Sequence, residues 1–344
     1  MNRPRITAII YALLAAVFYA LNAPASKVLL EKIPPTMMAG FLYLGAGIGI
    51  GILSLIRRED SHGQDRLTRS DLPYVIGMVV LDIAAPVLLM YGLLYTNAAN
   101  ASLLNNFEIV ATTVIALLIF GEKVTGRLWI GILFITVSSV LLSCESAEGL
   151  HFSWGSLLVL AATVCWGFEN NCTRKISSRS TYEIVFIKGI FSGAGALALG
   201  LITGERCSDA AGILRAMILG FVAYGLSIFF YIRAQSVIGA ARTSAYYAVA
   251  PFIGAFISFV FLRESLSGNF AVALILMIIG TAIVVADTLI LNHAHTHTHV
   301  FTHTHDGSTH THVIEHSHEH THIGTGEEHH HTHADMNPHG GAIK

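Results

Sequence analysis

The chain carries little charge for its length. Only 12% of its 344 residues are Asp, Glu, Lys or Arg, whereas 53% are hydrophobic and the mean hydropathy is +0.61. A soluble domain is typically about 25% charged. The composition therefore argues against a soluble globular enzyme and against a disordered protein, and it favours a polytopic membrane protein. The sequence also lacks a basic patch, so we expect no nucleic-acid partner.

Cysteine is scarce as well. The four cysteines form no CxxC pair, which argues against a zinc ribbon or a thioredoxin-type centre. Cys144 and Cys207 both fall on the expected outer side of the membrane, where they could form a disulfide in an oxidising periplasm. The apolar segments lack histidine, a nucleophile–base set, a phosphate loop and a compact metal motif. We therefore expect a protein that is not an enzyme and requires no cofactor.

Ten apolar segments are long enough to cross a membrane, which takes about 20 residues. They are residues 7–27, 35–56, 72–94, 98–120, 126–144, 154–174, 183–203, 211–232, 240–262 and 268–291. We therefore predict an all-α polytopic membrane protein with ten transmembrane helices. The first segment has no clear cleavage site, so we interpret it as a retained helix and not as a signal peptide.

The basic residues predict the orientation of these helices. With ten spans both termini lie on one side, and that side carries 13 lysines and arginines against five on the other. Because basic connecting segments stay in the cytoplasm, we expect a protein of the cell (inner) membrane with both termini cytoplasmic. Its expected partners are a small-molecule substrate and membrane lipid, and a homodimer is left open.

The two halves of the chain resemble each other. Residues 17–27 align with 165–175, and residues 98–126 align with 240–268 in the same order. Each half holds five spans, an odd number, so the second half enters the membrane from the opposite side. This is the inverted-repeat plan of secondary transporters, in which the substrate site lies near the midplane between the halves.

The repeat predicts the domain organisation. We expect a first five-helix repeat at residues 1–146, a second at 147–291 and a tail at 292–344.

The fourth helix of each repeat carries the most specific pattern. The two copies read TNAANASLLNNFEIVATTVIALLIFGEKVTG and IGAARTSAYYAVAPFIGAFISFVFLRESLSG. Each starts with small residues and a serine and ends with a glutamate. In this pattern the chain resembles the EamA-type transporters of the drug/metabolite transporter (DMT) superfamily, over about residues 7–290. The resemblance implies two five-helix repeats and transport of a small metabolite. The chain departs from the family pattern in the middle of both copies, where Glu108 has no following proline and Pro251 has no preceding glutamate.

Two acidic residues lie deep in the predicted spans. An ionisable side chain there costs at least about 2.5–3.5 kcal/mol on insertion scales. Asp82 and Glu108 each lie roughly 15 Å into their helices, near the midplane. If both face a cavity, they form a carboxylate pair that could carry a proton or bind a cationic amine or a metal ion. The alternative is that each binds a neighbouring hydroxyl or amide and serves packing. Asn105 and Asn106, one turn from Glu108, add amide donors and acceptors.

Further polar residues complete the predicted substrate pathway. Asn22 and Asn170 occupy matching positions in the two repeats, where they either bind substrate or join helices. Tyr246 and Tyr247 lie opposite the Asn105 region by the repeat relation, and either line the cavity or pack at its edge.

An ion pair is predicted near the cytoplasmic side. Glu169 and Lys188 both fall within roughly 8 Å of that side by the helical rise. Their pairing would be structural or would form an inner gate.

The tail beyond Asn292 is rich in histidine. It holds 17 of the 19 histidines, most of them alternating with threonine or other small residues, and we expect it to be disordered and cytoplasmic. Imidazole is suited to zinc, nickel, cobalt and copper, so the tail is a candidate metal-binding segment; the alternatives are incidental affinity or a response to pH near 6.5. The expected ligands are His293, His295, His297, His299, His303, His305, His310, His312, His316, His318, His320, His322, His329, His330, His331 and His333.

Three hypotheses for the function follow. The leading one is an exporter of a small metabolite that works by alternating access, is coupled to protons through Glu108 and Asp82, and has a metal-binding tail. The second is a transporter of zinc, nickel or cobalt in which oxygen atoms of these residues and the asparagines bind the ion. The third is a membrane-anchored metal sensor or store without transport.

Overall fold

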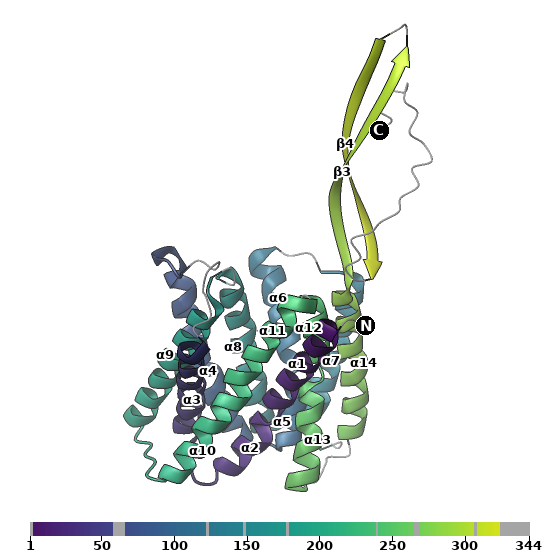
Figure 1. The fold of residues 1–344 in the computed structure, drawn as a ribbon. Helices are drawn as coiled ribbons and strands as arrows, with labels where there is room; N and C mark the ends of the chain where they lie inside the picture. Colours follow the sequence, from purple (N-terminus) through teal and green to yellow (C-terminus); the bar gives the residue numbers. More distant parts are fainter. Residues whose placement is uncertain are drawn as a thin grey trace. The chain divides into compact units, whose positions relative to one another are not determined.

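The apolar segments of the sequence form helices, as predicted (Figure 1). The computed structural model describes residues 3–57, 66–121, 124–146, 149–176, 179–238, 240–264, 269–305 and 308–323. The first half contains α1 (Arg3–Ala20), α2 (Asn22–Leu29), α3 (Pro35–Arg57), η1 (Arg69–Asp71), α4 (Leu72–Tyr95), α5 (Ala98–Leu104), α6 (Phe107–Phe120) and α7 (Gly126–Ser143). The second half contains α8 (Trp154–Lys175), α9 (Thr181–Ile202), α10 (Ala210–Gly220), η2 (Phe221–Leu226), α11 (Ser227–Ile238), α12 (Ala240–Tyr247), α13 (Ala250–Leu262) and α14 (Phe270–Leu289).

Nine helical stretches of the described residues are long and apolar enough to cross a membrane. They coincide with nine of the ten predicted spans. The tenth, residues 154–174, is the 22-residue helix α8, which has the required length but a polar second half with Glu169, Asn170 and Asn171. This helix packs along α4 and α6, so its polar residues face protein. The prediction of an all-α membrane fold is confirmed.

The two halves pack closely through their second helices. α3 lies along α9, and they meet at Gly47 and Gly189. A Cβ atom built on Gly189 would lie 2.4 Å from the Cα of Gly47, a distance that van der Waals repulsion forbids. Small residues let membrane helices approach in this way, and here they hold the two halves in one compact unit, Met1–Asp287.

Two helical passes are interrupted at matching places. The pass at 98–120 breaks at Asn105 and Asn106 between α5 and α6, and the pass at 240–262 breaks at Ala248 and Val249 between α12 and α13. The repeat alignment pairs Asn106 with Ala248. A proline near the start of α13, Pro251, suits a helix start because its missing N–H has no helical partner there. Asn105, Asn106 and Val249 keep right-handed helical backbone angles, so each interruption is a local irregularity of one helical pass and not an unwound segment.

Charged side chains tie helix ends together at the end of the bundle where α2 and α13 stop (Figure 1). The Glu264 carboxylate accepts hydrogen bonds from the backbone N–H groups of Ala98 (2.8 Å) and Ala99 (2.9 Å) at the start of α5. The Lys27 ammonium donates to the carbonyls of Leu93 and Thr96 at the end of α4. Each charge satisfies backbone groups that a helix end leaves unpaired.

A third acidic side chain acts at the same end. Glu205 accepts from the Thr36 hydroxyl (2.8 Å), from the Met37 backbone N–H (3.0 Å) and from the Tyr91 hydroxyl (2.9 Å). It thereby caps the start of α3 and connects it to α4.

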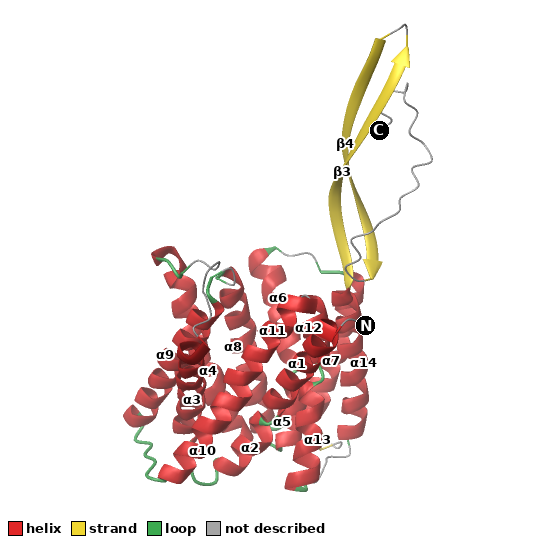
Figure 2. Cartoon of the chain, viewed as in Figure 1, coloured by secondary structure: helices red, strands yellow, loops and turns green. Residues whose placement is uncertain are grey.

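Strands occur in two places (Figure 2). A short antiparallel pair, β1 (Cys144–Ser146) and β2 (Gly149–Phe152), lies in the connection between α7 and α8. A second compact unit, Thr288–Lys344, contains β3 (Ile290–His305) and β4 (Ser308–Ile323), which pair antiparallel along their whole length. The period-two alternation with β-branched threonine suits strand pairing in this part of the tail. The predicted ligands His329, His330, His331 and His333 lie outside the described residues.

Candidate functional site

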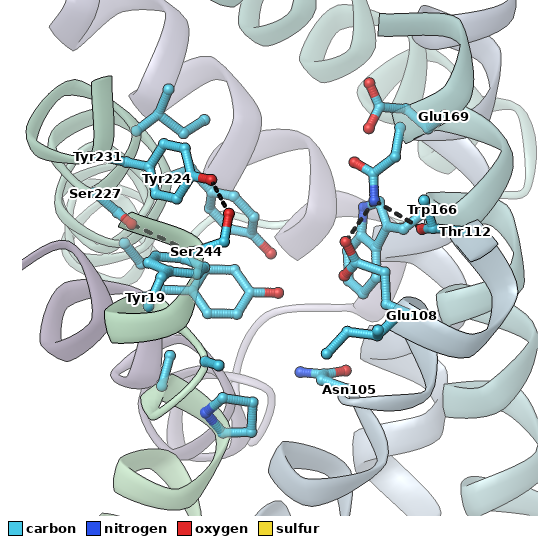
Figure 3. A pocket seen from close by; sticks show the side chains of 18 of the residues that line it. Tyr19, Asn105, Glu108, Thr112, Trp166, Glu169, Tyr224, Ser227, Tyr231 and Ser244 are labelled. Atoms are coloured by element: carbon cyan, nitrogen blue, oxygen red, sulfur yellow. Dashed lines mark hydrogen bonds between the residues drawn. The ribbon is translucent and has the colours of Figure 1, made fainter. Parts of the chain in front are cut away.

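A cavity of about 550 Å³ lies within the helical unit. This volume is in the range of about 300–1,000 Å³ that is usual for small-molecule sites. One wall comes from α6, α8 and the turn of Asn105 and Asn106 before α6, and the facing wall from α1, η2, α11 and α12 (Figure 3). Both interrupted helical passes border the cavity at their breaks, so each half of the chain contributes to each wall.

Glu108 is the central acidic group of the first wall. It lies in the first turn of α6, just after the break. Its carboxylate accepts a hydrogen bond of 2.6 Å from the Asn170 amide, which also lies 3.2 Å from the Thr112 hydroxyl (Figure 3). No lysine or arginine of the described residues forms an ion pair with Glu108. This carboxylate is therefore held by a neutral partner.

The second cluster of charge is centred on Lys188. Its ammonium lies 3.0 Å from Glu169 and 3.2 Å from Asp82. The Tyr43 hydroxyl donates to Asp82 at 2.9 Å, and the Thr173 hydroxyl donates to Glu169. The structure places Glu169 and Lys188 together, as expected from the sequence. One lysine thus serves two buried carboxylates.

This cluster changes the predicted role of Asp82. One alternative was a pair with Glu108 in a cavity and the other was a bond to a neighbouring group; its carboxylate is bound by Lys188 and Tyr43, and it is not among the residues that line the cavity. The physical reason is the full positive charge of Lys188, which is a better partner for a buried carboxylate than a second carboxylate. The pairing of Asp82 with Lys188 was not predicted, because the helical rise placed Lys188 near the edge of the membrane and Asp82 near its midplane.

Tyrosines form the wall that faces Glu108. Figure 3 shows Tyr19, Tyr224 and Tyr231 across the cavity from Glu108 and Asn105. The Tyr19 ring lies 6.0 Å from Tyr224, edge to face. The wall continues through Tyr247, whose ring centre is 5.8 Å from that of Tyr19 and 5.2 Å from that of Tyr231.

Two predicted pathway residues lie behind or beside this wall. Asn22 is buried and donates from its amide to the Tyr224 hydroxyl at 2.9 Å, so it orients a lining residue. Tyr247 lines the cavity, which was one of the predicted alternatives, whereas Tyr246 is not among the lining residues.

Tyr224 itself lies in the π-helical turn η2, a distortion that is common at functional sites.

Asn105 and Asn106 form the break itself and line the cavity. Both are buried, with 8% and 2% of their surface exposed. The Asn105 Oδ1 and the Asn106 Nδ2 have no hydrogen-bond partner within the described part of the chain. Buried polar atoms are normally paired, so these two atoms mark a place where a bound solute would find an acceptor and a donor.

Sequence reasoning missed several lining residues. Tyr19, Tyr43 and Trp166 border the cavity, although tyrosine and tryptophan in membrane helices usually mark the interface. Their position in the middle of a helical pass was the available signal, because a tyrosine hydroxyl or an indole N–H far from the interface needs a polar partner.

Metal and disulfide chemistry find no support in the described helices. No group of three or more His, Cys, Asp or Glu side chains in the described part of the chain could hold a metal ion. All four cysteines are free thiols, so the disulfide considered between Cys144 and Cys207 is not formed.

Comparisons with known proteins agree with this geometry. Residues 6–144 and 153–286 each match the model of the EamA-like transporter family. An "uncharacterized transporter" of Methanothermobacter thermautotrophicus is 26% identical over 288 residues, covering 78% of this chain and 83% of its own. A "probable amino-acid metabolite efflux pump" of Escherichia coli is 26% identical over 191 residues, covering 53% and 58%. A protein of known crystal structure has the same fold, with a TM-score of 0.59 at 16% identity over 80% of this chain and 94% of that one.

Proposed function

Because the chain belongs to the EamA-like transporter family, we propose that it is a secondary transporter that exports a small metabolite by alternating access in exchange for protons. The observation that carries the proposal is Glu108, a carboxylate in a metabolite-sized cavity with a neutral partner and no ion pair among the described residues. Such a group can bind either a proton or a cationic solute. Because the two compete for the same carboxylate, export of the solute is coupled to entry of protons.

Alternating access is supported by the matched breaks. Each break lies beside the cavity and belongs to a different half. Motion of one half against the other about these points would expose the site to each side in turn. The cluster of Lys188, Glu169 and Asp82 connects α9, α8 and α4 next to the site. We assign it a gating role, since its ion pairs join helices whose separation would open the cavity.

Export is supported by the contacts that join helix ends at one end of the bundle, given both termini in the cytoplasm of an inner-membrane protein. Tyr231 and Ser244 line the cavity and lie beside the connection between α11 and α12, which this orientation places at the cytoplasmic face. Lys27, Glu205 and Glu264 tie the opposite end together. The contacts at the opposite end would keep that end closed while solute loads from the cytoplasmic face. The name of the Escherichia coli relative, an efflux pump, agrees with this direction.

The test uses inside-out vesicles that contain the full chain and have an acidified lumen. Amino acids and amines are added one at a time, and a pH-sensitive dye reports loss of luminal protons. We expect at least one solute to release protons in the wild type and none to do so in Glu108→Gln. Glu31→Gln, which neutralises an exposed carboxylate outside the cavity, is the matched control and should behave as wild type. Solute uptake without proton release would refute the coupling, and a fully active Glu108→Gln would refute the role of Glu108.

We also propose that the tail binds a transition metal and regulates transport. The backbone register of β3 and β4 supports this, since it sets four histidines directly opposite four others: His293 and His320, His295 and His318, His297 and His316, and His303 and His310. Opposite positions in an antiparallel pair are close neighbours, and two imidazoles at such positions are common metal ligands.

Metal content of purified protein tests the tail. After dialysis against zinc, nickel, cobalt or copper, the full chain should retain several ions and the chain ending at residue 291 at most one. Equal retention by both would assign the metal to the helices. In that case a transition-metal transporter, or a metal sensor without transport, would replace metabolite export as the better hypothesis.

A further inference from the structure

We propose that the cavity recognises its solute through an ammonium group, which Glu108 and Asn105 bind on one wall while the tyrosines cover it from the other. The inference rests on the proposed transport function and names its substrate class: a small organic cation with N–H donors, a neighbouring oxygen acceptor and an apolar or aromatic body.

The charges around the cavity favour a cation. Three carboxylates, those of Glu108, Glu169 and Asp82, lie in or directly behind the cavity wall, against the single ammonium of Lys188. That ammonium is already shared by Glu169 and Asp82. Within the described residues, Glu108 is bound by the Asn170 amide and forms no ion pair. A buried carboxylate without a counter-ion is costly, so a positive solute gains from binding here and a negative one is repelled.

The unpartnered amide atoms of Asn105 and Asn106 determine which donors and acceptors the solute must carry. An ammonium carries up to three N–H donors, so one group can donate to Glu108 and to the unpaired Oδ1 of Asn105 together. The unpaired Nδ2 of Asn106 then requires an acceptor on the solute. An amine that carries a hydroxyl or carbonyl oxygen on a neighbouring carbon satisfies all three atoms.

The facing wall suits the same class. A cation over the face of a tyrosine ring gains about 0.5–2 kcal/mol, depending on how far it is desolvated. Tyr19 and Tyr224 lie across the cavity from Glu108 (Figure 3), and Tyr247 extends this wall. Between the two walls, the aromatic surface also accommodates the apolar body of the solute.

The fluorescence of a tryptophan in the cavity can report solute binding. Trp166 lines the cavity, whereas Trp129 and Trp154 are 47% and 76% exposed on the outside of the bundle. The full chain with Trp129→Phe and Trp154→Phe therefore reports solute binding through Trp166 fluorescence. The solutes are 2-phenylethylamine, 2-phenylethanol and phenylacetate, which share a ring and differ in charge. A fourth, 2-amino-1-phenylethanol, adds the acceptor oxygen.

We expect both amines to bind at least tenfold more tightly than the alcohol, with phenylacetate the weakest, because a hydrogen bond to a charged group contributes more than a neutral one. The amine with the hydroxyl should bind more tightly than 2-phenylethylamine, and Asn106→Leu should remove that difference. Glu108→Gln should remove the preference for amine over alcohol, and Glu108→Asp should retain it. Asn105→Leu should weaken amine binding several-fold, whereas Thr113→Val, whose hydroxyl is satisfied by the Ile109 carbonyl, should not.

The other outcomes would overturn the ammonium proposal, and they distinguish its failure from failure of the proposed transport function. Equal binding of amine and alcohol, or an amine preference that persists in Glu108→Gln, overturns the proposal. Quenching of Trp166 by zinc alone that requires Glu108, without amine binding, also overturns it in favour of a metal site. If a neutral or anionic solute releases protons from vesicles through Glu108, the ammonium class is wrong but proton-coupled transport stands. If no solute is transported in any condition, the proposed function itself fails.

Discussion

Replacing Lys188 with methionine should destabilise the helical unit strongly. The Lys188 ammonium lies 3.0 Å from Glu169 and 3.2 Å from Asp82, and these two side chains are 2% and 0% exposed. At an effective dielectric constant of about 20, each attraction is about 5 kcal/mol before desolvation is counted. Removing one partner of a buried ion pair typically costs about 3–5 kcal/mol, because an uncompensated charge remains. We expect Lys188→Met to lose stability by at least that amount.

The charge balance of the cluster allows a sharp control. The triple variant Lys188→Met, Asp82→Asn and Glu169→Gln removes all three charges while preserving side-chain size. It should recover most of the lost stability, because replacing a buried ionic cluster by neutral groups is often nearly neutral. The Tyr43 hydroxyl can still donate to an amide oxygen at position 82, so that contact survives the change.

Thermal unfolding in detergent with a thiol-reactive dye provides the assay, since Cys165 and Cys172 are partly buried free thiols in α8. A loss of 3–5 kcal/mol lowers the midpoint by about 10 °C for a unit of this size. A midpoint for Lys188→Met within about 2 °C of wild type would refute the stabilising effect of the cluster. A triple variant no more stable than the single one would show that packing of the lysine stem matters more than its charge.

Three further predictions concern stability. Glu264→Ala should lower the unfolding midpoint by several degrees, because the Ala98 N–H loses a charged acceptor and such bonds contribute about 1.5–3 kcal/mol; a midpoint equal to wild type would contradict the cap. Gly189→Val should prevent folding, measured as loss of the monodisperse peak in size-exclusion chromatography, since its side chain would overlap Gly47, whereas Gly126→Ala, with no atom within 4 Å of the added carbon, should behave as wild type. Removing the tail should leave the midpoint unchanged, because it forms a separate compact unit; a lower midpoint would mean that the tail stabilises the helices.

Local polarity and spacing made part of the site predictable. A carboxylate is costly in a membrane helix wherever it lies, so Glu108 could be identified without knowledge of its neighbours. The interruptions at Asn105–Asn106 and Ala248–Val249 were not predicted, although the repeat alignment pairs Asn106 with Ala248. The pairing of Glu169 with Lys188 followed from their similar depths, because both positions depend only on the helical rise.

The sequence by itself determined the number and type of the helices, since the length and polarity of each segment decide whether it can cross a bilayer. It also determined the inverted repeat, which follows from an odd number of spans per half. Only the tertiary structure decided which polar groups meet. Asp82 and Glu108 have similar depths, yet Asp82 is bound by Lys188 and Glu108 by Asn170, because rotation about each helix axis and the packing of neighbouring helices set the direction of a side chain. The tyrosine wall depends on the same packing, which brings α1, η2, α11 and α12 to one side of the cavity.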